Sequence, residues 1–550
     1  MSTPLLIVNA RVWSGTPLAA DAVLVSDARI VAVGRAAELS DAGPGAHVVD
    51  AAGGTLTPGL TDAHIHFVPW ARARHQPDLG GASTQAEALA RIAAVLAQLP
   101  ADGAALVGRG WDESGWEAAP ERAALDTLAS DRPLLLHRHD FHALWVNSAA
   151  LAAAGVTRAT PDPAGGRFER DGAGEPTGLV REHAVRAFAA LEALAAPAID
   201  DALLAEAAAA LHAEGITGVH DFQREHDDWQ RMRALAARGS LRVLQQIGPA
   251  QLRERARLGL AGGVGDGWFR TGSLKLFADG TLGSRTAALL EPYADHGGHG
   301  MTLMSPRELT GAVGEAAAAG FSVAIHAIGD AAVRHALDAI AVHHGALMKL
   351  GLPPRIEHVQ LLSDADLPRF AVLGVAASMQ PQHATTDAAV ARRAWGSRCR
   401  MSYPWRSLLA AGARLAFGSD APVEPPLARL GLAAAVARMA ADGVPFEPAQ
   451  AIPLDAALAG YTRVPAVLAG GGLGCGRLEP GAPADLVVWD RDLHAATPDA
   501  LALARPRLTA LAGEIVYDSR SGTVAGHVVP GAREPAAARA PASRRAGSEG

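Results

Sequence analysis

The sequence TPGLTDAHIH (residues 57–66) is a short apolar run that ends in two histidines, His64 and His66. Seven similar runs follow, separated by Ala-rich stretches typical of helices: ITGVHDF (216–222), LRVLQQI (241–247), GSLKLFADG (272–280), FSVAIHA (321–327), RIEHVQ (355–360), VAASMQP (375–381) and LAFGSDAP (415–422). Strands that alternate with helices form parallel βαβ units, and eight such units favour a closed (β/α)8 barrel. We therefore predict an α/β protein with its chemistry at the carboxyl ends of the barrel strands.

The segments on either side of this region have a different sequence pattern. Residues 1–57 and 475–530 contain short β-type runs broken by turns and lack helical periodicity, so we expect the two chain ends to form one β domain. Residues 58–474 then hold the barrel. The connection at 68–180 is far longer than a usual βα loop and predicts an insertion that acts as a lid over the barrel mouth. Residues 531–550 are mostly Ala, Arg, Pro, Gly and Ser, which predicts a disordered tail.

The composition excludes several classes of protein. The 550 residues are 49% hydrophobic, which is enough for a large core, and the formal net charge of −8 gives no basic surface for nucleic acid or anionic membranes. Two cysteines, Cys399 and Cys475, cannot form a disulfide framework. With neither a basic leader nor a long apolar segment, we expect a cytoplasmic enzyme that acts on a small molecule, with a homodimer among its possible assemblies.

Metal-ligating residue types recur at the ends of the predicted strands. Two histidines two residues apart on a strand point to the same face. Alone, this HxH pattern has about even odds of being two ordinary polar residues. Later strands, however, also end in residues of the metal-ligand type, and imidazole and carboxylate are the ligands that zinc and its neighbours prefer. The predicted metal site comprises His64, His66, Lys275, His326, His358 and Asp420.

Lys275 is unusual in this chain. Of 49 basic residues only Lys275 and Lys349 are lysines, so a lysine inside an apolar strand suggests chemistry that arginine cannot perform. An ammonium group beside two cations is repelled. Carboxylation by CO2 converts the amine into a carbamate whose two oxygens can bridge two metals. The alternative is an ordinary ion pair with Asp279, which the surrounding histidines disfavour.

Six motifs resemble one known family. They are TPGLTDAHIH, RPLLLHRHDFHALWVNSAAL, KLFADGTLGSRTAAL, HAIGD, RIEHVQ and GSDAPVEP, and together they are similar to the amidohydrolase superfamily, in its branch of YtcJ-like and N-substituted formamide deformylase proteins. The resemblance covers nearly the whole chain. It implies two divalent ions, zinc first and manganese or cobalt as alternatives, and a small β-sandwich built from both chain ends.

The resemblance also implies a role for each ligand. His64 and His66 hold the more buried metal, His326 and His358 hold the more exposed one, and carboxylated Lys275 bridges the two. Asp420 binds the first metal and serves as the proton shuttle.

This ligand set predicts hydrolysis by a metal-bridged hydroxide, because bound metals lower the pKa of water. The expected substrate is a small-molecule amide or formamide, cleaved at an exocyclic, non-peptide C–N bond. Two alternatives stay open. One is a cyclic amidase or deaminase of the same superfamily, and the other is a catalytically silent regulatory protein that keeps the metal site.

Candidate substrate contacts are less clearly marked. In the insertion we select Trp111 and His142, since the segment mixes aromatic and polar groups as a lid does. Asp279 and Arg285 lie in the loop after the lysine strand, where the glycines serve either substrate binding or only the turn. Glu357 is expected to point away from His358 and to pair with arginine or backbone.

Overall fold

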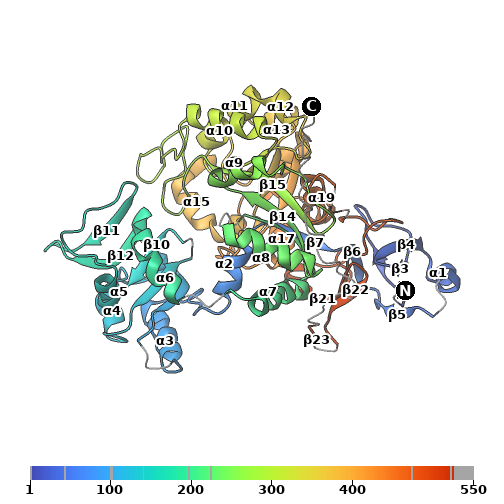
Figure 1. Ribbon diagram of the computed structural model, residues 1–550, viewed down its shortest axis with the longest axis horizontal. Helices are drawn as coiled ribbons and strands as arrows, with labels where there is room; N and C mark the ends of the chain where they lie inside the picture. Colours follow the sequence, from blue (N-terminus) through green and yellow to red (C-terminus); the bar gives the residue numbers. More distant parts are fainter. Residues whose placement is uncertain are drawn as a thin grey trace, which may run out of the picture.

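Eight parallel strands form a sheet near the centre of the computed structural model (Figure 1). Their order in the sheet is their order along the chain. They are β7 (Leu60–Ile65), β13 (Ile216–Asp221), β14 (Arg242–Ile247), β15 (Phe269–Phe277), β16 (Val323–Ala327), β17 (Arg355–His358), β18 (Ala376–Met379) and β19 (Arg414–Phe417). Ile65 forms a parallel bridge with Ala421, just beyond β19, which joins the first strand to the last. The predicted barrel is confirmed, and each predicted run overlaps one of these strands.

The structure describes residues 3–42, 45–99, 103–139, 141–195, 199–222, 226–471, 473, 475–520 and 523–524. The predicted tail, 531–550, lies outside these residues. Within the described part of the chain, no helix combines the length and apolar character needed to cross a membrane.

Helices between the strands pack on the outside of the barrel. Leu204 and Leu211 of α7 (Asp201–Ala213) share a buried core with Val219 of β13 and Val243 of β14. Local sequence fixes where these helices begin, as at Ser305, whose hydroxyl accepts the N–H of Glu308 while the Glu308 carboxylate accepts the N–H of Ser305. The helices are α2 (Phe67–Ala73), α7 (Asp201–Ala213), α8 (His226–Ala237), α9 (Pro249–Arg257), α10 (Pro306–Ala318), α11 (Asp330–Val342), α12 (His344–Leu347), α13 (Arg369–Val372), α14 (Pro381–Thr386), α15 (Ala388–Trp395), α16 (Trp405–Ala410), α17 (Ala428–Ala437), α18 (Leu454–Tyr461) and α19 (Arg463–Leu468), with 3-10 turns η3 (Gly396–Met401) and η4 (Pro448–Gln450).

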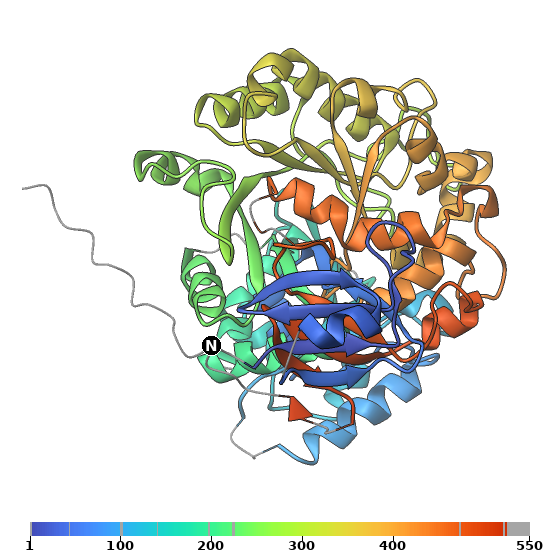
Figure 2. The ribbon, with the colours of Figure 1, turned by 90° about the vertical axis from the view of Figure 1, so that its right-hand side faces the viewer.

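Strands from the two chain ends lie together in a second unit, seen at the front of Figure 2 in blue and red. One sheet has the order β4 (Arg29–Gly34), β3 (Ala22–Ser26), β1 (Leu5–Val8), β5 (His47–Asp50). The other has the order β2 (Arg11–Val12), β6 (Thr55–Pro58), β20 (Leu486–Trp489), β21 (Pro506–Leu511), β22 (Glu514–Asp518), β23 (Thr523–Val524). Ile7 and Val23 of the first sheet share a core with Val488 of the second. Helices α1 (Ala36–Ala42) and α20 (Pro498–Leu503) accompany these sheets.

The connection after β7 forms a separate lobe, at the left of Figure 1. Its sheet has the order β11 (Gly166–Arg170), β12 (Pro176–Glu182), β10 (Ala143–Val146), β9 (Leu134–Arg138), β8 (Leu106–Trp111). The lobe also contains α3 (Gln85–Leu96), η1 (Glu113–Gly115), α4 (Arg122–Asp126), α5 (Ser148–Ala153), η2 (His183–Phe188) and α6 (Ala189–Ala195). It has apolar clusters of its own, and it extends past residue 180, because η2 and α6 pack on its sheet.

Candidate metal centre

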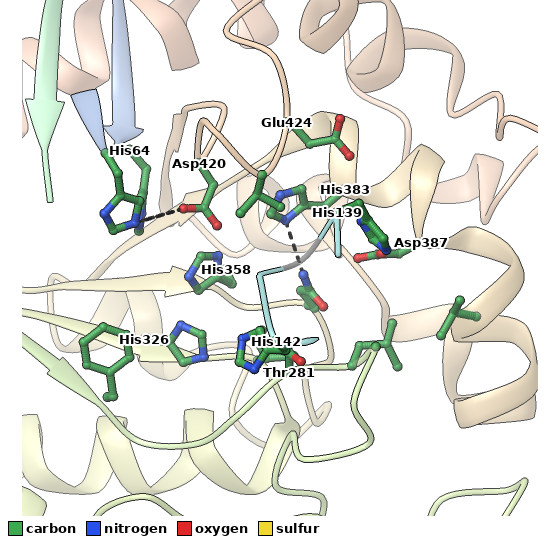
Figure 3. Close-up of a pocket in the computed structure, with 18 of the residues that line it drawn as sticks. His64, His139, His142, Thr281, His326, His358, His383, Asp387, Asp420 and Glu424 are labelled. Carbon is green, nitrogen blue, oxygen red and sulfur yellow. Dashed lines mark hydrogen bonds and ion pairs between the residues drawn. The ribbon is translucent and has the colours of Figure 1, made fainter. Parts of the chain in front are cut away.

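All six predicted ligands line one cavity of about 210 Å³ at the carboxyl ends of the barrel strands. Figure 3 shows the cavity and labels His64, His326, His358 and Asp420 among them. His64, Lys275, His326 and His358 lie on β7, β15, β16 and β17, and His66 and Asp420 follow β7 and β19. The Nε2 atoms of His64 and His66 lie 3.5 and 3.4 Å from the same Asp420 oxygen, Oδ1. The ring centres of His326 and His358 are 4.5 Å apart. The structure therefore brings together residues from five strands.

Hydrogen bonds join the DAHIH and GSD motifs directly. The Asp62 carboxylate accepts the N–H of His64 and both the N–H and the hydroxyl of Ser419, at 3.1, 3.0 and 2.6 Å. Gly418 allows this approach, since a Cβ there would lie 2.3 Å from the backbone nitrogen of His64. Asp420 has a φ of 61° and His358 a φ of 75°, a strained region for such residues that is often occupied at functional sites.

Acceptor groups around the histidines fix their tautomers. Nδ1 of His64 lies 2.7 Å from Oε2 of Glu357, Nδ1 of His358 lies 2.8 Å from Oε1 of Gln380, and Nε2 of His326 lies 3.0 Å from the Gly280 carbonyl oxygen. Because these oxygens only accept, each of these nitrogens carries the hydrogen. The other ring nitrogen of each histidine keeps a lone pair, as a metal ligand requires.

Arg355 holds Glu357 in place. The guanidinium donates to both carboxylate oxygens of Glu357, at 2.5 and 3.0 Å, and to the Ala63 carbonyl oxygen at 2.7 Å. Glu357 thus pairs with arginine, as expected, and its contact with His64 adds an orienting role that the sequence reading did not include.

Burial sets the ionisation of the cluster. It lowers the pKa of His64 to about 4 and that of His326 to about 3, and the charge on Lys275 adds to both shifts. For Asp420, burial opposes ionisation, but His64 and the hydrogen bond from His66 outweigh it and hold the pKa well below its usual value. At neutral pH His64 and His326 are therefore neutral imidazoles beside the ionised carboxylate of Asp420, a donor set that fits a divalent metal.

Lys275 is almost completely buried at 1% exposure, with Nζ 4.6 Å from the ring centre of Phe222 and 4.9 Å from that of Phe277. Phe222 also stacks on His64, with ring centres 3.8 Å apart. The lysine therefore extends along an aromatic wall beside the histidines, inside the ligand cluster.

His383 is a site residue that the sequence reading missed. It lies in α14, just after β18, and one of its ring nitrogens comes within 4.8 Å of a ligand atom of His358 and one of Asp420. Ligand atoms of His64, His66 and Asp420 also lie within 4.8 Å of one another. The rule that strand ends carry chemistry also applies to the motif MQPQH (379–383), so the signal was present in the sequence.

The insertion reaches the cavity through His139 and His142. Nδ1 of His142 lies 2.8 Å from Oε2 of Glu182, at the end of β12. From the barrel side, Thr281 and Leu282 line the same space. The cavity therefore lies between the strand ends and the inserted lobe, where a lid is expected.

Three of the four predicted substrate contacts do not line this cavity, which differs from the sequence expectation. Trp111 is fully buried in the lobe, with its indole N–H donating to the Leu136 carbonyl. Asp279 is also buried, and its carboxylate accepts the backbone N–H groups of three residues: Ile328, Gly329 and Ala288. Arg285 pairs with Asp295 at 2.6 Å. Of the four, His142 alone borders the cavity.

An α/β barrel with a histidine-rich ligand cluster at its strand ends is the architecture of a metal-dependent hydrolase. A model of the amidohydrolase family matches residues 47–517, and the chain belongs to this family. It is 32% identical over 515 residues to YtcJ of Bacillus subtilis, named as an amidohydrolase, with 90% of this chain and 96% of that protein covered. It is also 32% identical over 530 residues to the N-substituted formamide deformylase of Arthrobacter pascens, covering 89% and 93%. A metal-dependent hydrolase from Pyrococcus horikoshii matches with a TM-score of 0.73 and 26% identity, covering 90% of this chain and 99% of that one.

Proposed function

We propose that this protein hydrolyses the exocyclic C–N bond of a small amide or formamide with two divalent metal ions. The observation that carries the proposal is the tautomer set, in which His64, His326 and His358 each keep a lone pair beside the ionised Asp420. The likeness to the formamide deformylase supports the choice of bond.

Two groups of side chains are suited to hold the two ions. His64, His66 and Asp420 form the first group, and His326 and His358 form the second. Lys275, carboxylated by CO2, is the bridge in this proposal, because an unmodified ammonium disfavours two nearby cations. When bound, the ions supply an activated water and polarise the substrate carbonyl.

Asp420 is the proposed proton shuttle. Its carboxylate is ionised and lines the cavity, so it can accept the proton of the attacking water and return it to the leaving amine. Once the water has added to the carbonyl, the C–N bond breaks, and the products are a carboxylic acid and an amine. No protein nucleophile is needed.

A metal count and a substrate panel test this proposal together. We expect close to two divalent ions per chain, loss of activity on chelation, and recovery with zinc, manganese or cobalt. The panel contains N-formyl and N-acyl amines, with cyclic amides and exocyclic amines such as aminopurines for comparison. Preference for cyclic amides or deamination supports the corresponding alternative. If the metal-loaded protein turns over no compound of the panel, the alternative of a catalytically silent regulatory protein is favoured.

A further inference from the structure

The His383 imidazole has one ring nitrogen that the described protein leaves unpaired. Its Nδ1 lies 3.4 Å from Nε2 of Gln360, which is an amide nitrogen and can only donate. Nδ1 is therefore the acceptor, and the ring hydrogen resides on Nε2. Among the described residues Nε2 has no hydrogen-bond partner, although the side chain is 94% buried, with 6% exposure.

This nitrogen belongs to a side chain that lines the cavity beside the ligand cluster. Figure 3 shows the His383 ring between Asp420 and Asp387, with Glu424 above it in that view. The ring is nearly parallel to that of His358, at 13°, with ring centres 6.3 Å apart. A buried N–H without a partner is costly, and a ligand that accepts from it removes that cost.

A hydrogen on Nε2 argues against a ligand role for His383, because a ligating imidazole needs a lone pair. Catalytic metal sites also keep one coordination position open for substrate. The carboxylates of Asp387 and Glu424 border the same part of the cavity, so the partner of this N–H is a neutral acceptor rather than an anion.

We propose that His383 binds substrate through a hydrogen bond from Nε2–H to the carbonyl oxygen of the scissile amide, an inference that rests on the proposed function. The donor lies beside the reacting centre, where negative charge builds up on that oxygen as water adds. Gln360 is then a positioning residue, since it holds the ring in the donating tautomer.

The test compares His383→Phe, which keeps a flat ring but removes the donor, with His383→Gln, which keeps an N–H. As a matched control we choose His47→Gln, at an exposed position in β5 of the β domain. For His383→Phe we expect kcat/KM on an N-formyl amine to fall about 10²- to 10³-fold, as for loss of an oxyanion donor, with two metal ions per chain retained. His383→Gln should keep roughly tenfold more activity than His383→Phe.

A second readout does not depend on turnover. In metal-depleted protein, His383→Phe should raise the Kd of the same N-formyl amine roughly threefold to tenfold. His47→Gln should leave this Kd unchanged. If His383→Phe does not fold, as judged by thermal unfolding, His383→Gln decides. A kcat/KM about 10- to 100-fold below that of the unaltered protein, with two metal ions per chain retained, supports the donor role. An unchanged kcat/KM or a loss of metal contradicts it.

The other outcomes separate failure of the His383 inference from failure of the proposed function. Loss of metal in His383→Phe makes His383 a ligand and overturns the inference alone. Unchanged kcat/KM and Kd in that variant also overturn it, while the proposed function stands. If the unaltered, metal-loaded protein hydrolyses no member of the panel, both proposals fall.

Discussion

Nδ1 of His64 lies 2.7 Å from Oε2 of Glu357, and both side chains are almost completely buried, at 1% and 0% exposure. The contact directs Nε2 of His64 toward Asp420. A carboxylate behind a ligating histidine fixes its tautomer and makes the free nitrogen more basic. The Glu357 carboxylate therefore supports the proposed metal site without bordering the cavity.

Glu357→Gln should weaken metal binding about 10- to 100-fold. The amide lacks the negative charge that accepts the hydrogen bond from Nδ1 of His64 and pairs with the Arg355 guanidinium. Competition with a chelator measures the affinity. Glu308→Gln, at an exposed helix start, is the control. Equal affinities in the altered and unaltered proteins would show that the orienting contact is unimportant for the metal.

Asp420→Asn should keep most of the metal but lower kcat about 10²- to 10⁴-fold, since the amide retains an oxygen ligand and loses the base. Metal content and kcat are measured on the same sample. A near-normal kcat would place the proton shuttle on another group.

Lys275→Arg should be as damaging as Lys275→Ala, because a guanidinium keeps the positive charge but cannot form the carbamate. In the alanine variant, acetate or propionate supplied with metal should restore part of the activity by occupying the vacated space. Mass spectrometry of the intact native protein checks for the added CO2. Full activity of Lys275→Arg contradicts the bridging role.

Asp279→Asn should lower the free energy of unfolding by about 1–3 kcal/mol, because an amide cannot accept all three backbone N–H groups that the carboxylate accepts. Denaturant unfolding measures the change, with metal content as the control. An unchanged stability together with an altered substrate preference would restore the substrate role expected from the sequence.

His212 makes stability depend on pH. Burial lowers its pKa to about 4, below the value near 6.5 in the unfolded chain, so the unfolded state binds the proton more readily. The stability contribution is present above pH 6.5 and is lost as the pH falls toward 4, on the order of 3 kcal/mol. His212→Gln should flatten the dependence of Tm on pH in that window. The same substitution at exposed His47 is the comparison, and an equal effect there would contradict the assignment to His212.

The barrel and its six candidate ligands could be predicted because both depend on local signals. Short apolar runs mark the strands, and residues at their carboxyl ends meet by the geometry of a parallel barrel. Lys275 was recognisable because arginine is the usual cation of this chain.

Contacts between distant segments could not be predicted in the same way. Glu357 and His64 are 293 residues apart, and no spacing rule links them. Trp111 looked like a lid residue, but its indole N–H finds a carbonyl inside the lobe, which favours burial. For His383, the sequence placed it after a barrel strand but gave no sign of the Gln360 contact that sets its tautomer.

The pairing of β6 with β20 affects how the protein is made on the ribosome. The indole N–H of Trp489 donates to the hydroxyl of Thr57, 432 residues earlier in the chain. At roughly 5–20 residues per second, about 20 to 90 s separate the synthesis of the two strands. Throughout that time β6 lacks its C-terminal neighbour and exposes a sheet edge that can join other chains. The second sheet of the β domain can therefore be completed only when synthesis of the chain is nearly finished.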